Sequence, residues 1–355
     1  MRRYQDQTLY SASDLMHFLS CTHAAALDIL NLDTPLQKTA DTDQQEMFQR
    51  RGLEHEKAYL EELRRSGRSV TEITVKGVDL QAAMAATLEA MKSGVDVIYQ
   101  ATLFRAPWHG FADFLVKVPK PSSLGDYSYE AVDTKLARTA QPKHILQLCI
   151  YSDLLESIQG VRPDHMSVKL GNGTMYRLRF DDVAHYYHHA KLRFEDFIAD
   201  QSRATIPEPC SYCDMCVWRD NCNAEWLRTD HLCQVANIKR DQIHKLNDNG
   251  FTTLEQLAKA STDLKVRKMG AETANRLRAQ AELQFKKRRD GDNHLEILPL
   301  RPSRGFERLP QPNVGDLFFD MEGDPLYDGS LEYLFGVITA STVKRHSQHS
   351  GPMIM

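Results

Sequence analysis

The chain has 355 residues, of which 42% are hydrophobic and 26% are charged, values close to those of ordinary globular proteins. This composition excludes a wholly disordered chain, and the length is enough for two or three domains. The mean hydropathy is −0.48, and no apolar run approaches the roughly 20 residues that cross a bilayer, so the sequence predicts no membrane span. No apolar stretch follows the charged N-terminus, and we therefore expect a cytoplasmic protein rather than an exported one.

The formal net charge of −4 is distributed unevenly along the chain. Residues 235–289 hold 13 Lys and Arg against 6 Asp and Glu, a local charge of +7, so the rest of the chain carries −11. A basic segment in an acidic chain predicts contact with a polyanion such as nucleic acid. A solvated helical surface explains the same charges, and the count alone does not choose between the two.

The hydrophobic pattern predicts helices first, then a meander of strands, and then alternating helix and strand. Predicted helices of the first 200 residues cover 14–30, with Cys21 inside, 45–65, 80–91, 142–157 and 183–197. Predicted strands cover 70–75, 97–104, 110–118, 127–136, 167–170 and 175–180. The inward face of the second helix is expected to carry Phe48, Leu53, Tyr59, Leu60 and Leu63. This order favours an α/β fold with a mixed central sheet.

After residue 232 the predicted secondary structure changes twice along the chain. Short helices are predicted over 243–246, 254–260 and 271–285, a proline-rich stretch follows them, and a new apolar strand begins at Leu317. We therefore expect a first domain over residues 1–232, a small all-α segment over 233–290, a linker over 291–312, and the start of another domain over 313–355.

Carboxylates and a lysine occupy matching places on two neighbouring predicted strands. Asp113 ends a Gly-Phe-Ala-Asp run, and Asp133-Thr134-Lys135 lies on the next strand. Because side chains alternate along a strand, Asp133 and Lys135 point to one face, where carboxylates of adjacent strands can hold a divalent cation. The lysine would then orient water or stabilise the charge that develops during phosphodiester hydrolysis. Taken alone, the same residues are also typical of an exposed cross-strand salt bridge.

Two further features extend this pattern. His55 lies in Gly52-Leu53-Glu54-His55-Glu56 on the second predicted helix, and Gln147 and Tyr151 share one face of the helix after the strands. With Asp113 and the D-x-K sequence, they resemble the RecB-like branch of the PD-(D/E)XK nuclease superfamily, whose motifs occur here in the same order.

The resemblance implies a restriction-endonuclease-like core and a role for each residue. Lys135 is the catalytic lysine, while Gln147 and Tyr151 shape the catalytic site and contact the DNA. Taken alone, Tyr151 is more often a core-packing residue, and His55 is more often a capped or core histidine. The implied ligands of Mg²⁺ or Mn²⁺ are His55, Asp113 and Asp133.

Four of the seven cysteines lie close together near residue 215. Cys213, Cys216 and Cys222 have the spacing of thiolate ligands, and a soft metal centre takes four such ligands. Cys210 is the nearest fourth, which gives a zinc knuckle. The chain also resembles the iron–sulfur RecB-like nucleases of the AddB and CRISPR-associated types, where one cysteine precedes the core and three follow it. That resemblance implies a [4Fe–4S] cluster on Cys21, Cys213, Cys216 and Cys222, with Zn²⁺ as the alternative.

The basic segment resembles helix-hairpin-helix modules. Asn249-Gly250 follows one predicted helix and Met269-Gly270 precedes another, and glycine turns of this kind present backbone N–H groups to a phosphate. Such contacts do not depend on base identity. A small helical spacer is the alternative interpretation.

A possible second site lies near the end of the sequence. Asp320 and Glu322 resemble the first motif of RNase H-like DEDD exonucleases, which need further carboxylates from later strands to bind two metals. The expected domain start over 313–355 does not supply them, so we expect this site to be incomplete and inactive.

Together these features predict a Mg²⁺- or Mn²⁺-dependent DNA nuclease, and the alternative is a non-catalytic iron–sulfur or zinc module that binds nucleic acid. The expected partner is DNA, single-stranded or with ends, although the residues do not distinguish DNA from RNA. No G-x-x-x-x-G-K-[ST] motif occurs, so any ATP-driven unwinding would come from a helicase partner.

Overall fold

The structure is a computed structural model that describes residues 1–74, 79–200, 204–300, 302–324, 327, 331–339 and 347–350. The chain divides into two compact units, Met1–Asn293 and His294–Met355. The first unit contains a large sheet, its covering helices and the basic helical segment. The second contains a small sheet.

A six-stranded mixed sheet lies at the centre of the first unit, which confirms the predicted α/β class. Its strands follow one another in sequence order, with the first and fourth pairings parallel and the others antiparallel. The predicted strand over 70–75 is observed over its first residues, and residue 75 lies outside the described residues. The strands are β3 (Val70–Glu72), β4 (Val97–Arg105), β5 (Trp108–Val118), β6 (Ser128–Lys135), β7 (His165–Leu170) and β8 (Met175–Arg179).

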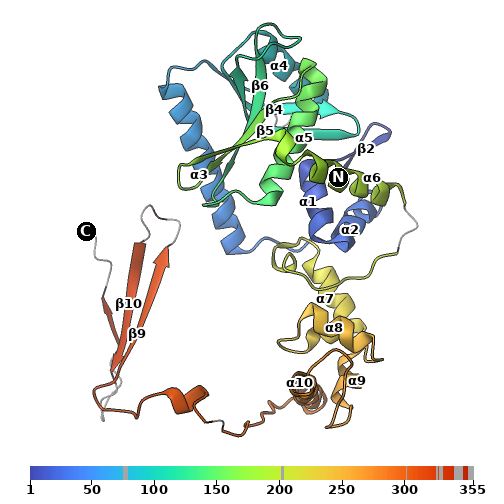
Figure 1. Cartoon of the computed structure of the whole chain (residues 1–355), viewed down its shortest axis with the longest axis vertical. Coiled ribbons are helices and arrows are strands. Elements are labelled where there is room, and N and C mark those ends of the chain that lie inside the picture. Colours follow the sequence, from blue (N-terminus) through green and yellow to red (C-terminus); the bar gives the residue numbers. More distant parts are fainter. Residues whose placement is uncertain are drawn as a thin grey trace. The chain divides into compact units, whose positions relative to one another are not determined.

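Helices cover both faces of this sheet (Figure 1). On one face, α3 (Asp43–Arg65) packs against a small core that includes Phe114, while the next residue, Leu115, belongs to the larger core on the opposite face. This alternation is the period of two that a strand imposes. The larger core also takes side chains from α1 (Ala12–Ser20), α2 (Thr22–Asp33), α4 (Leu80–Lys92), α5 (Pro142–Gln159) and α6 (Ala184–Ala199).

The first predicted helix is wrong in one respect, because it is interrupted at Cys21. The backbone of Cys21 is extended, with φ −159° and ψ 110°, so α1 ends before it and α2 begins after it. The Cys21 sulfur accepts a hydrogen bond from the Ala24 N–H at 3.4 Å, which makes this residue the N-cap of α2. Cys21 therefore lies at the junction between two helices and not inside one helix.

The second predicted helix is observed, but part of its expected apolar face is wrong. The helix α3 begins at a capping box, in which Thr42 and Gln45 satisfy each other's backbone N–H groups. Its C-terminal half is buried on the sheet, whereas Phe48 and Leu53 are 38% and 57% exposed. The helix extends beyond the sheet at its N-terminal end, so apolar spacing there has no core to meet.

The basic segment folds into helices around a core of its own. Its core contains Leu246, Leu257 and Leu277, among other buried residues. The helices here are α8 (Arg240–Asn247), α9 (Leu254–Ala258) and α10 (Ala271–Asp290), after α7 (Arg219–Arg228) in the cysteine-rich stretch. Among the helices that the structure describes, none combines the length and the apolar character that crossing a bilayer requires.

The second unit is an antiparallel sheet in the order β11-β10-β9. The sequence predicts its first strand near Leu317, and two further strands pair beside it. The last strand is polar, and backbone pairing requires no apolar pattern. The strands are β9 (Leu317–Asp324), β10 (Leu331–Thr339) and β11 (Ser347–Ser350).

Candidate active site and candidate metal centre

The structure brings Asp113, Asp133 and Lys135 together. In the antiparallel pairing of β5 with β6, Phe114 stands opposite Val132, and one step further along the same register places Asp113 opposite Asp133. Asp133 and Lys135 are two residues apart on β6 and therefore share a face. The sheet itself thus holds the three functional groups at one place, near the C-terminal end of β6.

The contacts of the two carboxylates differ. Asp113 Oδ2 accepts hydrogen bonds from the backbone N–H and from the hydroxyl of Thr134, both at 2.8 Å. Asp133 is fully buried and forms an ion pair with Lys135. Apart from this ion pair, Asp133 Oδ2 has no hydrogen-bond partner among the described residues. A buried carboxylate oxygen that accepts no hydrogen bond is a donor atom suited to a hard cation.

The electrostatics of the pair point the same way. Burial, and then the charge of Asp113, raise the pKa of Asp133 to about 8. Burial lowers the pKa of Lys135, but the charges of Asp133 and Asp113 outweigh it, so that pKa is raised overall. Two crowded carboxylates disfavour each other's charge, and a bound divalent cation would remove that conflict. The donor set therefore fits Mg²⁺ or Mn²⁺.

Gln147 and Tyr151 lie beside this pair, on one face of α5, as predicted. Gln147 Nε2 donates to the Tyr151 hydroxyl at 2.8 Å and approaches Asp133 Oδ1 at 3.4 Å. A Cβ on Gly110 would lie 2.5 Å from the Tyr151 ring, so the ring packs directly on the glycine backbone. Gly110 thus explains why the Gly-Phe-Ala-Asp run begins with a residue that has no side chain.

His55 is placed differently from the other predicted residues. Its Nε2 lies 3.2 Å from the backbone carbonyl oxygen of Lys169 on β7. Among the described residues, His55, Asp113 and Asp133 do not form a trio whose ligand atoms all lie within 4.8 Å of one another. The structure therefore brings the two aspartates together but does not bring His55 into a closed ligand set with them.

Glu56, the residue after His55, is the acidic group from α3 that the sequence reasoning missed. Its side chain is buried and hydrogen-bonded by Gln100. Burial, and then the charge of Asp113, raise the pKa of Glu56, whereas the charge of Lys135 lowers it, so this carboxyl lies within reach of both groups. The available signal was the position of Glu56 three residues before Tyr59, on the buried face of the helix.

Five cysteines line one small pocket. Cys21 reaches it from the break between α1 and α2, three cysteines come from the stretch before α7, and Cys222 lies on α7 itself. The pocket therefore joins the predicted leading cysteine with the predicted trio, and it includes the cysteine of the zinc alternative as well. Its lining cysteines are Cys21, Cys210, Cys213, Cys216 and Cys222.

The distances in this pocket bear on the kind of centre that it fits. Four thiolates on one tetrahedral zinc ion, with Zn–S bonds of about 2.3 Å, lie roughly 3.8 Å from one another. Cys210 Sγ and Cys213 Sγ are 3.8 Å apart, but among the residues that the structure describes no three cysteine sulfurs lie mutually within 4.8 Å. A cluster of several iron atoms separates its thiolates further than one ion does. The Cys210–Cys213 separation equals that of two thiolates on one zinc ion, and the pocket as a whole gathers five thiols.

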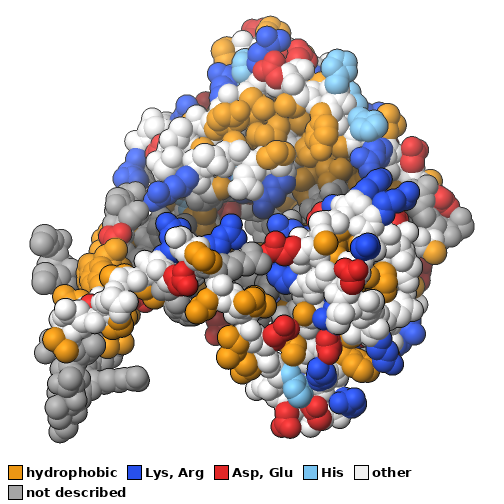
Figure 2. All heavy atoms as spheres, turned by 60° about the horizontal axis from the view of Figure 1, so that its bottom comes forward, with side chains coloured by type: hydrophobic (Ala, Val, Ile, Leu, Met, Phe, Trp, Pro, Cys, Tyr) orange, Lys and Arg blue, Asp and Glu red, His pale blue; other side chains and the backbone are white. Residues whose placement is uncertain are grey.

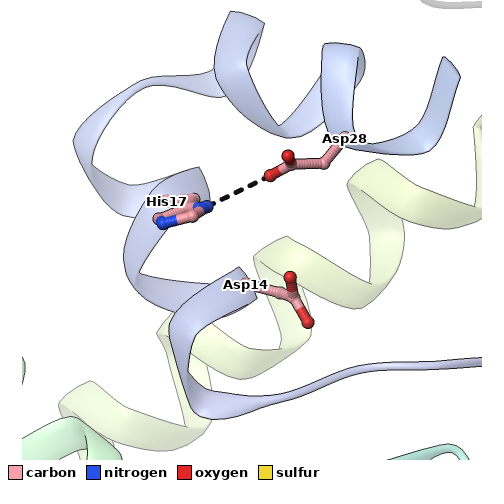
Figure 3. Close-up of side chains that lie close together, drawn as sticks. All are labelled: Asp14, His17 and Asp28. Carbon is pink, nitrogen blue, oxygen red and sulfur yellow. Dashed lines mark hydrogen bonds and ion pairs between the residues drawn. The ribbon is translucent and has the colours of Figure 1, made fainter. Parts of the chain in front are cut away.

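A second polar cluster, which the sequence reasoning also missed, adjoins the cysteine pocket. His17 Nδ1 on α1 lies 3.1 Å from Asp28 Oδ2 on α2, and Figure 3 shows these two side chains facing each other. Asp14 completes the one trio of the described residues whose ligand atoms lie within 4.8 Å. However, Asp14 Oδ2 accepts two hydrogen bonds from Ser11, and Asp28 Oδ1 accepts one from the Trp218 indole N–H. These groups are already satisfied by the protein, so we assign them a bracing role and no ion.

The two glycine turns of the basic segment lie against each other. The Arg267 N–H donates to Asn249 Oδ1 at 3.1 Å, which ties the loop before α10 to the turn after α8. Arg267 and Lys268 are exposed there and enter no ion pair among the described residues. On the face shown in Figure 2, Lys and Arg side chains occur in several groups with acidic side chains between them.

Asp320 and Glu322 lie on one face of β9, as predicted, and both are exposed. No third carboxylate of the described residues closes a ligand set with them.

No family model matches the chain, and no curated protein matches it either.

Proposed function

We propose that the protein is a metal-dependent DNA nuclease with a PD-(D/E)XK core of the RecB-like branch. The observation that carries the proposal is the convergence of Asp113, Asp133 and Lys135 at one place on a mixed sheet, with Gln147 and Tyr151 packed beside them. A structural salt bridge requires one acid and one base. Here a second carboxylate, Asp113, lies beside the Asp133–Lys135 ion pair, and its charge acts on both groups. Two carboxylates at one place are what a divalent cation needs.

Each residue has a defined task in this proposal. Asp113 and Asp133 hold the cation through carboxylate oxygens, and the cation supplies Lewis-acid stabilisation of phosphodiester charge and an activated water. Lys135, held by its ion pair with Asp133, donates hydrogen bonds to a scissile phosphate oxygen or to the attacking water. Gln147 fixes the orientation of Asp133 from the side of α5. The third protein ligand comes from α3, where the resemblance assigns His55 and the burial pattern favours Glu56.

We further propose that the cysteine pocket carries a [4Fe–4S] cluster on Cys21, Cys213, Cys216 and Cys222. The support is that all four line one pocket, which joins the break between α1 and α2 to the later cysteines. Such a cluster would tie the break between α1 and α2 to α7 and to the stretch before it. The alternative is one zinc ion on the four local cysteines. Measuring the zinc, iron and sulfide content of the purified protein distinguishes the two.

The helices α8 to α10 are proposed to bind the nucleic-acid backbone. The support is the pair of adjoining turns at Asn249 and Arg267, which places exposed cationic side chains near the N-terminus of α10. Backbone N–H groups and cations at such a place contact phosphates without reading bases. DNA is the proposed substrate because of the nuclease resemblance.

The decisive experiment is degradation of end-labelled single-stranded and double-stranded DNA, and of RNA, with Mg²⁺ or Mn²⁺ and with a chelator. We expect cleavage that requires the metal and is lost in Lys135→Ala. The matched control is Lys169→Ala, a lysine of the adjacent strand that pairs with Glu62 on the α3 side and should leave cleavage near wild type.

Two outcomes would count against the proposal. Binding without cleavage by the fully metal-loaded wild type would favour the non-catalytic module. Cleavage that survives Lys135→Ala would move the chemistry to another site.

A further inference from the structure

The cysteine pocket holds one thiol more than a four-cysteine centre uses, and that thiol has a close neighbour. Cys210 Sγ lies 3.8 Å from Cys213 Sγ, and the Cys210 backbone N–H donates to Cys213 Sγ at 3.3 Å. We propose that Cys210 and Cys213 form a reversible disulfide when the centre is empty, and that this disulfide prevents the centre from assembling. The second half of this inference rests on the proposed role of Cys213 as a ligand.

The backbone between the two cysteines already has the geometry that a disulfide needs. The Cys213 N–H donates to the Cys210 carbonyl oxygen at 3.1 Å, which closes a four-residue turn. In such a turn the first and last Cα atoms lie within about 7 Å, and disulfides span Cα distances of about 4.4–6.8 Å. The sulfurs must approach by roughly 1.8 Å to reach the bonded distance, which side-chain rotation can supply.

Two other cysteines of the pocket have sulfurs that contact backbone N–H groups of their own neighbours. The Cys21 sulfur accepts the Ala24 N–H, and the Cys216 sulfur accepts the Trp218 N–H, each at 3.4 Å. Cys21 does interact with Cys210, because the Cys210 thiol contributes, after burial, to raising the pKa of Cys21. A Cys21–Cys210 disulfide is therefore the main competitor, and the experiment must distinguish the two.

Access for an oxidant is built into the surface beside Cys210. Cys210 and Cys21 line an open hollow of about 760 Å³ that also exposes Arg193 and Tyr186. Cys213, Cys216 and Cys222 are not part of its lining and face the inner pocket. A soluble disulfide can therefore react with Cys210 first. Cys213, on the side of the inner pocket, can then attack the Cys210 sulfur.

The chemistry is a two-step exchange with a small-molecule disulfide as oxidant. The Cys210 thiolate attacks the oxidant, which forms a mixed disulfide and releases one thiolate. The Cys213 thiolate then attacks the Cys210 sulfur and releases the second. Two electrons pass to the oxidant, which becomes two thiols and takes up the two cysteine protons. A sulfur held in a disulfide has no thiolate to offer a metal, and a dithiol reductant restores it.

The test uses the full chain, freed of metal under anaerobic conditions and treated with oxidised glutathione. Alkylation and peptide mapping should find two of the seven cysteines blocked and joined as Cys210–Cys213. The oxidised chain should take up neither iron with sulfide nor zinc until dithiothreitol is added. These readouts do not involve DNA cleavage, so failure of the nuclease proposal would leave the test intact.

Two variants sharpen the test. Cys210→Ser should lose the disulfide and should not be blocked by oxidised glutathione, and Cys210→Ala repeats the measurement should the serine variant fail to fold. Cys233→Ser, which removes a cysteine outside the pocket lining, should oxidise as the wild type does. A mapped Cys21–Cys210 bond, a stable glutathione adduct on Cys210, or unimpeded metal uptake by the oxidised chain would overturn the proposal.

Discussion

The two candidate sites of the first unit are assembled in opposite ways. The carboxylate site stands on β5 and β6, neighbouring strands whose hydrogen-bonded ladder fixes the side chains whether or not a cation is bound. The cysteine pocket joins Cys21 to cysteines about 190 residues later, through contacts such as the Trp218–Asp28 hydrogen bond. A cation at the first site, as proposed, would add chemistry to a site that the sheet already holds, whereas a metal centre at the second would add a link between parts of the chain far apart in sequence.

Removing a carboxylate charge should therefore abolish activity and spare the fold. We expect Asp113→Asn or Asp133→Asn to reduce cleavage on the order of 100-fold or more, because a neutral amide loses several kcal/mol of metal-mediated stabilisation of the transition state. Far-UV circular dichroism should match the wild type. Asp96→Asn, at a surface ion pair with Lys117 far along the sheet, is the control that should keep activity. Wild-type turnover in either site variant would discard the site.

Removing a cysteine ligand should, in contrast, destabilise the fold. If Cys21 shares one centre with the later trio, the centre closes a loop of about 190 residues, and its loss frees a large part of the chain. We expect Cys21→Ala to be colourless and sensitive to protease, while Cys210→Ala keeps the brown colour of an iron–sulfur cluster. The zinc alternative predicts the reverse. Iron, sulfide and zinc analysis of both variants and the wild type decides, and one zinc per wild-type chain would contradict the cluster.

Glu56 and His55 test how far the first site extends onto α3. We expect Glu56→Gln to weaken Mn²⁺ affinity and cleavage by on the order of 10- to 100-fold, since its carboxyl lies within reach of the charges of Asp113 and Lys135. His55→Gln should have the smaller effect, because His55 Nε2 is occupied by the Lys169 carbonyl. Calorimetric titration with Mn²⁺ measures both. The opposite order of effects would restore His55 as the ligand.

The parts of this molecule that sequence reasoning predicted share a physical cause. Asp133 and Lys135 had to share a face because a strand has a period of two, and the six strands were visible as alternating or apolar runs. The choice between His55 and Glu56 was not available in the same way. Adjacent residues on a helix differ by about 100° in direction, and which one meets the site depends on how α3 lies across the sheet, a tertiary property.

The sequence was enough to predict which cysteines lie together, but not the backbone geometry that brings Cys21 to them. Spacing and resemblance grouped Cys21 with the later trio, yet no local pattern showed the helix break that brings Cys21 there. The sequence placed it inside a helix because the apolar spacing continues past it, and the extended backbone at Cys21 overrides that spacing. The bracing pair of His17 and Asp28 was missed for the same reason, since it exists only once the single predicted helix has become two.

The basic segment offers a weaker effect that is separate from both sites. Substituting Arg267→Glu and Lys268→Glu should leave cleavage chemistry intact and weaken DNA binding. The slope of log affinity against log salt should fall in magnitude by roughly 1 to 2, the value for two lost phosphate contacts. Lys92→Glu on α4, an exposed lysine outside the segment, is the matched control. An unchanged slope in the double variant would remove this surface from the proposed interface.

The smallest effect concerns the stability of the sheet itself at acid pH. His109 on β5 is buried, and its Nδ1 has no hydrogen-bond partner among the described residues. Burial, and then the charge of Arg2, lower the pKa of His109 to about 4, below the value near 6.5 of an unfolded histidine. The folded state therefore favours neutral His109. Its contribution is full above about pH 6.5 and is lost as the pH falls toward 4, by about 2 kcal/mol once solvent screening is allowed for.

Urea unfolding of the metal-free protein at pH 7 and pH 4.5 measures this loss, and His109→Leu should show a smaller decrease in the free energy of unfolding than the wild type. His189→Leu, at an exposed position on α6, should decrease as the wild type does. Because the metal-free chain lacks the long-range link of the cysteine pocket, any acid sensitivity that His109→Leu removes belongs to the sheet. An equal decrease in all three proteins would place the acid-sensitive groups elsewhere, and the sheet would then be less sensitive to pH than its buried histidine implies.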